Sequence, residues 1–495
     1  MLKKTVVRLL PLLLLLALVP ASAASARPVD VLPQVLAPCP GAEPVSAVAA
    51  PLARAAAAGP SVRKVVRDAA EGEHVPPADA ERYEAIYERA LAARVRLSGR
   101  RRAELAAVVA QLEAFARGGT LTVSRMPALF LQLDANTSWW SEHAPPAPPK
   151  PKPGATPCAG GAGQGGARVV RDEIVLQWYA GQGLQLQQLA TAGRANALVK
   201  ACLEPNPELA CDRTRVKTAM DGLAMLAVDR GGFRAWEYYF GFGGGRPPWI
   251  SGLAQGTAMQ ALSRGAQVLG DPAYLAVARE ALGAFERRAP AGVRVPAGAG
   301  NHYLIYSFNP GLRVFNAFTQ SLVGLYDYAE AADDDTARAL FAAGERRLRE
   351  ELPGADTGAW SRYSAGGAES DLGYHKLLRD FLRSLCDRTK RALYCSTADR
   401  FTGYLTEPPK MRFLPASRAR ARAGSLARFY LTKISCVTLT VTRAGKTVAT
   451  RSAVLGRGAR SLGWVPPSRG AYRVTVSAQD LAGRRASIAT TVRAG

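Results

Sequence analysis

Seven segments between residues 172 and 386 carry apolar residues at intervals of three and four, and this helical period most constrains the fold. Gly, Pro or Asn interrupts the period between them, so each segment is predicted to be a separate amphipathic helix. Such helices bury their apolar faces by packing in layers. We therefore predict a mainly α domain over residues 171–408. The segments are 172–200, 213–229, 251–269, 273–288, 313–332, 335–350 and 370–386.

A loose internal repeat refines this prediction. The sequence WYAGQGLQLQQLATAGRANAL from Trp178 resembles WISGLAQGTAMQALSRGAQVL from Trp249, because both hold a tryptophan, a Gln-Gly pair and then a helical pattern. A repeated loop-plus-helix unit is typical of an α/α toroid, an incomplete α/α barrel. The alternative is a chance likeness between two helices rich in Ala and Gln.

The first residues have the pattern of an export signal. Two lysines precede a short apolar run over residues 9–19, and Ala21-Ser22-Ala23 supplies small residues at cleavage spacing. We predict a signal peptide over residues 1–23, with an uncleaved N-terminal anchor as the alternative. No later apolar stretch is long enough to span a bilayer, so the protein is expected to be secreted or associated with the cell surface.

Composition and period also divide the rest of the chain. A Pro- and Ala-rich stretch predicts a poorly ordered leader, and a Pro- then Gly-rich stretch predicts a linker. The C-terminal residues alternate as strands do, which predicts a small all-β, immunoglobulin-like sandwich. The predicted parts are a leader over 24–77, a helical N-terminal region over 78–143, a linker over 144–170, a basic linker over 409–427 and the sandwich over 428–495.

The seven cysteines are informative if the protein is exported, because an oxidising compartment permits disulfides. Cys202 with Cys211, and Cys386 with Cys395, each bracket a short polar loop, so we predict two local disulfides. The pairing of Cys39 and Cys158 is left open, and Cys436 is left odd. No CxxC, HxH or HExxH motif occurs, so we expect no metal site and no other cofactor.

Charge is the second strong compositional signal. The formal charge is +24, and removal of a signal peptide leaves +21. A surface this basic attracts polyanions, and for an exported protein the candidates are acidic polysaccharide, a teichoic-acid-like polymer, anionic lipid and nucleic acid. Charge alone does not choose among them; we expect acidic polysaccharide and no nucleic acid. The alternative is an arginine bias without functional meaning. The sequence leaves open a homodimer.

The residues from Trp249 to Asp271 resemble the start of the C-terminal domain of the D-glucuronyl C5-epimerase family. The resemblance continues through Phe315-Asn316-Ala317-Phe318, through SLVGLYD from Ser321, and to Tyr374-His375. It covers the main domain and neither the N-terminal region nor the β-tail. Enzymes of that family convert glucuronic to iduronic acid within heparan-type chains, which implies an isomerase acting on polymer-bound uronic acid.

The resemblance implies the site residues as well. It places the family's catalytic tyrosines on Tyr306, Tyr363 and Tyr374, and it puts Leu304 and Ile305 where the family has paired glutamates. A site that removes a proton beside a carboxylate needs donors on that carboxylate and acid and base groups on opposite faces of the ring. The candidate substrate-binding residues are Trp249, Gln255, Arg264, His302, Asn316, Arg362 and His375.

Three functions stay open at this point. The first is an epimerase, the second is a lyase that expels the C4 substituent from the same carbanion, and the third is a catalytically silent glycan-binding protein. The apolar Leu304 and Ile305 favour the third function, whereas the retained tyrosines favour the first. Glu237, from another loop, is a candidate for the missing carboxylate.

Overall fold

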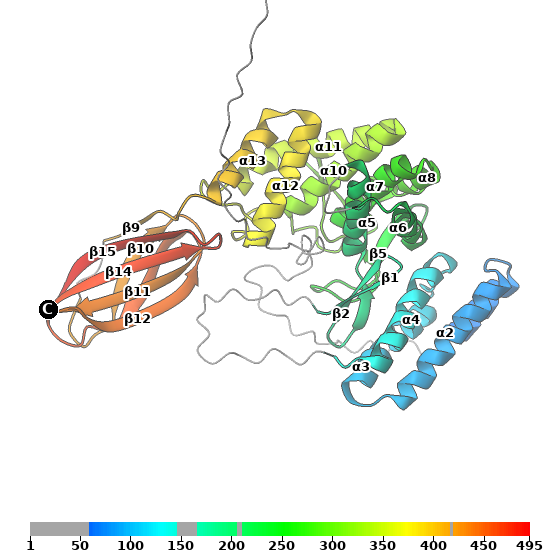
Figure 1. The fold of residues 1–495 in the computed structure, drawn as a ribbon, viewed down its shortest axis with the longest axis horizontal. Helices are drawn as coiled ribbons and strands as arrows, with labels where there is room; N and C mark the ends of the chain where they lie inside the picture. The colour runs from blue at the N-terminus through cyan, green and yellow to red at the C-terminus, as the bar shows by residue number, and fades with distance from the viewer. Residues whose placement is uncertain (1–58, 146–165, 205–209, 416–418) are drawn as a thin grey trace, which may run out of the picture. The chain divides into compact units, whose positions relative to one another are not determined.

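The computed structural model describes residues 59–145, 166–204, 210–415 and 419–495 (Figure 1). The expected signal peptide, most of the leader and most of the Pro/Gly-rich linker lie outside these residues. All described residues belong to one compact unit. They form helices together with several small antiparallel sheets.

The region before the linker is helical, and its helices are drawn in blue to cyan in Figure 1. The Oγ of Ser61 accepts the Lys64 N–H at 3.2 Å and caps the first helix, which lies in the segment expected to be a leader. Tyr83 stacks on Phe130 at 4.6 Å and joins the second helix to the fourth. The elements are α1 (Val62–Glu71), α2 (Pro77–Arg96), α3 (Gly99–Arg117), η1 (Val123–Arg125) and α4 (Met126–Glu142).

The prediction of a helix over residues 172–200 is wrong in its first half. A three-stranded antiparallel sheet precedes the helix, because the β-branched and aromatic run IVLQWY favours a strand. The turn after it needs two glycines at positive φ, 77° at Gly181 and 72° at Gly183. The buried Glu104 carboxylate accepts both glycine N–H groups and ties this turn to α3. The strands are β1 (Arg168–Arg171), β2 (Ile174–Tyr179) and β3 (Gly183–Leu186).

The sheet also overturns the internal repeat. The first Gln-Gly pair, Gln182-Gly183, lies at the hairpin between β2 and β3, whereas Gln255-Gly256 lies inside a helix. The two stretches share residue types but not backbone structure, so the likeness between them is compositional.

Beyond the sheet, helices dominate up to residue 404. Residues near the N-terminal ends of four of them, α5, α7, α10 and α12, meet in one apolar cluster, and residues near their C-terminal ends line one cavity. These four helices therefore run parallel, with α6, α8, α11 and α13 following them in the chain. The helices are α5 (Gln188–Leu203), α6 (Arg213–Leu226), α7 (Gly252–Leu269), α8 (Ala273–Glu280), α9 (Gly283–Glu286), α10 (Phe315–Ala332), α11 (Asp335–Glu351), η2 (Leu352–Ala355), α12 (Leu372–Thr389) and α13 (Ala392–Tyr404).

Two glycines bring α7 and α10 together. A Cβ on Gly324 would overlap the carbonyl oxygen of Gly256, and a Cβ on Gly256 would come within 2.7 Å of the Ser321 Cα. The two backbones approach this closely because neither glycine carries a side chain. Short strands join the helices: β4 (Ala227–Asp229), β5 (Arg234–Tyr238), β6 (Trp249–Ile250), β7 (Arg294–Ala297) and β8 (Gly300–Tyr303).

The predicted disulfides Cys202–Cys211 and Cys386–Cys395 are confirmed. Each closes the connection between consecutive helices, α5 to α6 and α12 to α13. The expectation that Cys436 is odd is wrong, because this residue is disulfide-bonded.

The C-terminal segment, which we call the β-domain (residues 411–495), holds two antiparallel sheets. One has the strand order β13-β10-β9 and the other β12-β11-β14-β15, and residues from both form one apolar core. Alternate residues of β11 and β14 are buried, as the period of two predicted. The strands are β9 (Met411–Phe413), β10 (Ser425–Leu431), β11 (Ser435–Arg443), β12 (Lys446–Leu455), β13 (Gly458–Trp464), β14 (Gly470–Asp480) and β15 (Arg485–Ala494).

Among the described residues, no helix combines the length and the apolar character that crossing a membrane requires.

Candidate functional site

The three predicted catalytic tyrosines lie in one group of side chains, which we call the aromatic cluster. Its members come from β5, the segments flanking α7 and α10, the loop before α12 and the first turns of these helices. Half-buried rings such as Phe242 and Phe308 pack against it, whereas the three tyrosines are themselves buried. The buried members are Leu189, Tyr238, Phe240, Trp249, Leu253, Ala254, Ile305, Tyr306, Val314, Ala317, Tyr363 and Tyr374.

Backbone hydrogen bonds place Tyr306 against Trp249. The Gly252 N–H donates to the Leu304 carbonyl at 2.8 Å, and the Ser307 N–H donates to the Ile250 carbonyl at 3.0 Å. The segment after β8 is thereby tied to the start of α7. As a result the Tyr306 ring meets the Trp249 ring edge to face, with 5.6 Å between centroids.

Tyr363 and Tyr374 form the second part of the cluster, with 4.7 Å between their ring centroids. The Tyr363 carbonyl accepts the Phe315 N–H at 3.2 Å, which fixes the loop to the start of α10. Asp371 caps α12 by accepting the Tyr374 N–H at 2.8 Å. Two independent backbone contacts therefore hold the pair of phenols.

Asn316, in the first turn of α10, is the polar residue that best fits a ligand contact. Its side chain is 2% exposed, and neither its amide nitrogen nor its amide oxygen bonds to another described residue. A buried amide without partners costs about 1–3 kcal/mol, so such a group in a native fold needs an explanation. Val314, two residues before it, and Ala317, the residue after it, belong to the aromatic cluster.

The two positions at which the resemblance implies glutamates are buried. Leu304 is 0% and Ile305 is 1% exposed, and both pack in the core. Glu237 does not replace them, because Tyr238 beside it on β5 packs in the cluster and successive residues of a strand point to opposite faces. The buried Glu237 carboxylate instead pairs with Arg125 and Arg230.

One carboxylate beside the cluster was missed by the sequence analysis. Burial raises the pKa of Asp371, against the opposing N–H bonds from Tyr374 and Gly373. A carboxyl group with a raised pKa at the start of the helix that carries Tyr374 is a candidate proton carrier. An Asp three residues before Tyr374, at the start of a predicted helix, was the available signal, and it also fits a simple cap.

His302 forms a buried pair with Glu351 rather than lying in a loop. Its Nδ1 is 2.8 Å from the Glu351 Oε2, and its Nε2 has no partner among the described residues. Burial lowers the pKa of His302, although Glu351 opposes this. Arg347 also bonds Glu351, at 2.6 Å. The side chain of His302 packs on Phe318 of α10.

Three other predicted substrate contacts already have protein partners. His375 bonds Ser361 Oγ through Nδ1 at 2.8 Å and the Phe401 carbonyl through Nε2 at 2.9 Å. Both amide atoms of Gln255 bond the backbone of Trp236. The half-buried guanidinium of Arg362 donates to the Gly367 carbonyl at 2.9 Å and closes the loop that carries Tyr363. These contacts fix the loop that carries Tyr363 and the helices beside the cluster.

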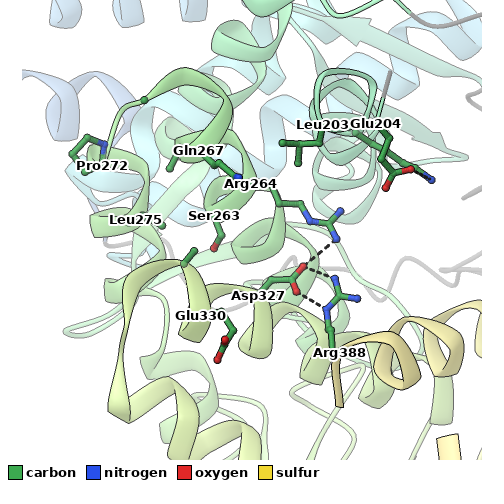
Figure 2. A pocket seen from close by; sticks show the side chains of 14 residues that line it. Leu203, Glu204, Ser263, Arg264, Gln267, Pro272, Leu275, Asp327, Glu330 and Arg388 are labelled. Carbon is green, nitrogen blue, oxygen red and sulfur yellow. Dashed lines mark hydrogen bonds and ion pairs between the residues drawn. The ribbon is translucent and has the colours of Figure 1, made fainter. Parts of the chain in front are cut away.

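Arg264 lies away from the cluster, in a separate cavity of about 650 Å³ that we call the polar pocket (Figure 2). It follows Gln255 by nine positions in α7, which is about 14 Å along a helix axis. Asp327 of α10 accepts from both Arg264 and Arg388. Burial lowers the pKa of Arg264, and Asp327 opposes that change. The polar pocket is therefore lined by charges that already compensate one another.

A search of the described residues for three or more grouped metal-ligating side chains found none.

The same part of the chain is similar in sequence to known proteins. The family model for the D-glucuronyl C5-epimerase C-terminus matches residues 230–403. A D-glucuronyl C5-epimerase from Caenorhabditis elegans is 33% identical over 178 residues, which cover 32% of this chain and 29% of the relative. This chain thus spans less than a third of that relative's length. Through residues 230–403 it nevertheless includes every site residue discussed above.

Solved structures of other sugar-converting enzymes are more distant. The cellobiose 2-epimerase from Bacillus thermoamylovorans matches with a TM-score of 0.35 and 10% identity, covering 56% of this chain and 70% of that chain. A D-mannose isomerase matches with a TM-score of 0.31 and 12% identity, covering 46% and 62%. The sequence match, and not these likenesses, is the informative comparison: residues 230–403 are similar to the C-terminal domain of the D-glucuronyl C5-epimerase family.

Proposed function

We propose that this protein is an exported carbohydrate epimerase that inverts C5 of glucuronic acid residues within an acidic polysaccharide. The observation that carries the proposal is the gathering of Tyr306, Tyr363 and Tyr374 in one aromatic cluster, within the segment that the family model matches. Aromatic rings such as Phe242 and Phe308 at its edge suit the apolar face of a sugar ring.

The reaction requires that a C5–H bond breaks and that a new one forms on the opposite face. The electron pair left on C5 delocalises into the adjacent carboxylate, which then needs hydrogen-bond donors. In the proposed site one phenolate takes the proton, and a phenol on the other face returns one, so no oxidant or cofactor is consumed. An ordinary phenol has a pKa of about 10, and a ligand-bound site must therefore stabilise its anion.

Asn316 supplies the donor that this scheme needs. Its amide is buried at the start of α10 and bonds no other described residue, so a uronate carboxylate or hydroxyl would satisfy it. Asp371 is the proposed proton carrier beside Tyr374. Trp249, behind Tyr306, keeps that ring in place.

The proposal includes a fold. Four parallel helices with return helices between them support an α/α toroid for residues 171–408, with the aromatic cluster at one end of the inner helices. In the β-domain, the Tyr472 hydroxyl donates to the Ser468 carbonyl at 2.7 Å, four residues upstream, beside the buried Trp464. A tyrosine bonded to the upstream backbone in this way supports an immunoglobulin-like sandwich.

Export and a glycan partner complete the proposal. Two disulfides favour an oxidising compartment and fit the predicted signal peptide over residues 1–23. We therefore propose a secreted or cell-surface location. A homodimer remains part of the hypothesis, to be tested by the mass of the protein in solution.

A catalytically silent glycan-binding protein is the second candidate function. The observation in its favour is the burial of Leu304 and Ile305, which leaves no carboxylate at the family's paired glutamate positions. In this case the cluster would bind a uronate without exchanging its proton.

One experiment separates these functions. The mature protein is incubated with uronate polymers in heavy water, and the C5 proton is followed by NMR. Deuterium at C5 with a changed configuration is the result expected for an epimerase. A new C4–C5 double bond identifies a lyase, and binding without exchange identifies the silent protein. Absence of both binding and exchange for every uronate polymer would overturn the proposal.

A further inference from the structure

The positive charge of this chain is concentrated in the β-domain. Residues 411–495 hold 16 of the 64 Lys and Arg residues but only one of the 40 Asp and Glu residues, which gives this segment +15 of the total +24. A general arginine bias does not explain this distribution, because the rest of the chain keeps nearly balanced charges. Asp480, the one acidic residue, is buried and paired with Lys433.

The fold gathers part of this charge at one end of the β-domain, where Figure 1 marks the C-terminus. The β11–β12 turn, the start of β14, the end of β15 and the residues before β10 meet there. We call six exposed residues at this end the basic end. They are Arg420, Arg422, Lys446, Arg469, Arg473 and Arg493.

Backbone contacts bring these residues together from distant parts of the sequence. The Ala421 N–H donates to the Gly495 carbonyl at 3.0 Å, and the Arg422 N–H donates to the Pro466 carbonyl at 2.7 Å. Arg493 pairs with Ala471 in the ladder that joins β15 to β14, which places it diagonally to Arg473.

The side chains of the basic end are available for a ligand. None of the six takes part in an ion pair within the described residues, whereas the exposed arginines of the helical regions are often paired, as Arg63 is with Glu88. Arg443, below the basic end, is held by Ser468 and by the face of Tyr472, with 5.4 Å to the ring centroid. Uncompensated charges in one place raise the local potential and attract a polyanion.

We propose that the basic end binds acidic polysaccharide. The choice of ligand rests on the proposed function. Five of the six residues are arginines, whose planar guanidinium groups pair with carboxylate and sulfate oxygens in two-point geometry. Trp464 and Tyr472, the aromatic residues next to this end, are buried, so nucleic acid bases would find no ring to stack on there.

The test replaces Arg420, Arg469, Arg473 and Arg493 together by Gln in the mature protein. A matched control replaces four exposed arginines of the helical regions, Arg67, Arg96, Arg102 and Arg287, and therefore removes the same charge. Affinities for heparin, hyaluronan, duplex DNA and phosphatidylserine vesicles are measured at physiological salt, and C5 exchange is measured on a uronate tetrasaccharide.

We expect the basic-end variant to bind heparin or hyaluronan about tenfold more weakly than wild type, and the control variant to change by less than about threefold. Tetrasaccharide exchange should be unchanged in both. If no variant exchanges C5 but the binding difference is present, the proposed function fails and this inference stands. Equal losses in both variants, or tighter wild-type binding to DNA or vesicles than to either polysaccharide, would overturn it.

Discussion

The aromatic cluster and the polar pocket lie at opposite ends of the same parallel helices and differ in how their polar groups are satisfied. The polar pocket has the volume of a ligand site, about 650 Å³, but Asp327 already compensates Arg264 and Arg388. The aromatic cluster includes phenols from several elements and adjoins the buried, unbonded amide of Asn316. A group that already has its partner stabilises the fold, whereas an unsatisfied one is available to a substrate. The comparison therefore favours the cluster as the proposed reacting site, although the polar pocket is the one with a measured volume of this size.

The largest expected effect is on the pair of touching phenols. Tyr363→Phe and Tyr374→Phe each remove one hydroxyl and keep the ring, so we expect C5 exchange to fall by about 10²-fold or more for either change. The double variant should lose little more than a single one, because groups that act as a unit are not additive. Exchange rates by NMR measure both quantities.

Tyr83→Phe is the matched control, since Tyr83 and Tyr363 are both 4% exposed but Tyr83 lies in α2. Additive losses from the two cluster variants, or an equal loss from the control, would argue against a shared role for the pair.

The second effect concerns the residue that follows Tyr374. Burial lowers the pKa of His375 to about 4, so between about pH 4 and the ordinary His value of about 6.5 the unfolded chain binds a proton that the folded protein does not. Stability therefore falls as the pH drops through this window. We expect wild type to lose about 3 kcal/mol more than His375→Gln between roughly pH 7 and pH 4. Urea unfolding at each pH measures the difference. Equal pH dependence of the free energy of unfolding in wild type and His375→Gln would contradict a buried, neutral His375 with two hydrogen bonds.

The third effect tests the polar pocket as a structural element. Asp327→Ala leaves Arg264 and Arg388 without their shared carboxylate, and we expect the free energy of unfolding to fall by about 2 kcal/mol. Asp399→Ala, which removes the exposed partner of Arg383, should cost less than about 1 kcal/mol. C5 exchange at a temperature where both variants are folded should stay near wild type. A specific loss of exchange in Asp327→Ala would assign chemistry to the polar pocket.

The smallest effect on stability is expected at Asn316. Asn316→Leu replaces an unsatisfied buried amide by an apolar group of similar size, so the free energy of unfolding should change by less than about 1 kcal/mol or increase. Binding of a uronate oligosaccharide, measured by calorimetry, should weaken by about tenfold, as expected for one hydrogen bond to a charged group. Unchanged affinity would remove Asn316 from the proposed site.

The sequence predicted the parts of the fold where the pattern has a clear period. The helices around Trp249 and Asn316, the strands of the β-domain and both local disulfides were expected. The strands β1 to β3 were not, because IVLQWY is a short apolar run that helical and strand patterns both accommodate. The strand structure of this region depends on the positive φ of Gly181 and Gly183 and on their N–H bonds to Glu104, which is distant in sequence.

For the candidate site, motif order proposed three tyrosines, which the fold places in one cluster, but it did not reveal the contacts of the polar residues around them. Gln255 and Arg264 lie in one helix, and only the three-dimensional fold shows that one of them anchors Trp236 and the other lines the polar pocket. Asp371 was missed because a helix cap and a proton carrier have the same sequence signature. Likewise, the basic end is assembled from four separate segments, so no single run of residues reveals it.

The rate of C5 exchange in Tyr306→Phe and Arg264→Gln, measured side by side on one uronate oligosaccharide in heavy water, tests the central claim most directly. Tyr306 contacts Trp249 in the aromatic cluster, and Arg264 pairs with Asp327 in the polar pocket. We predict that Tyr306→Phe loses at least about 10²-fold in rate while Arg264→Gln stays within about threefold of wild type. Loss of exchange in Arg264→Gln with retained exchange in Tyr306→Phe would contradict the account and move the reaction to the other end of the helices.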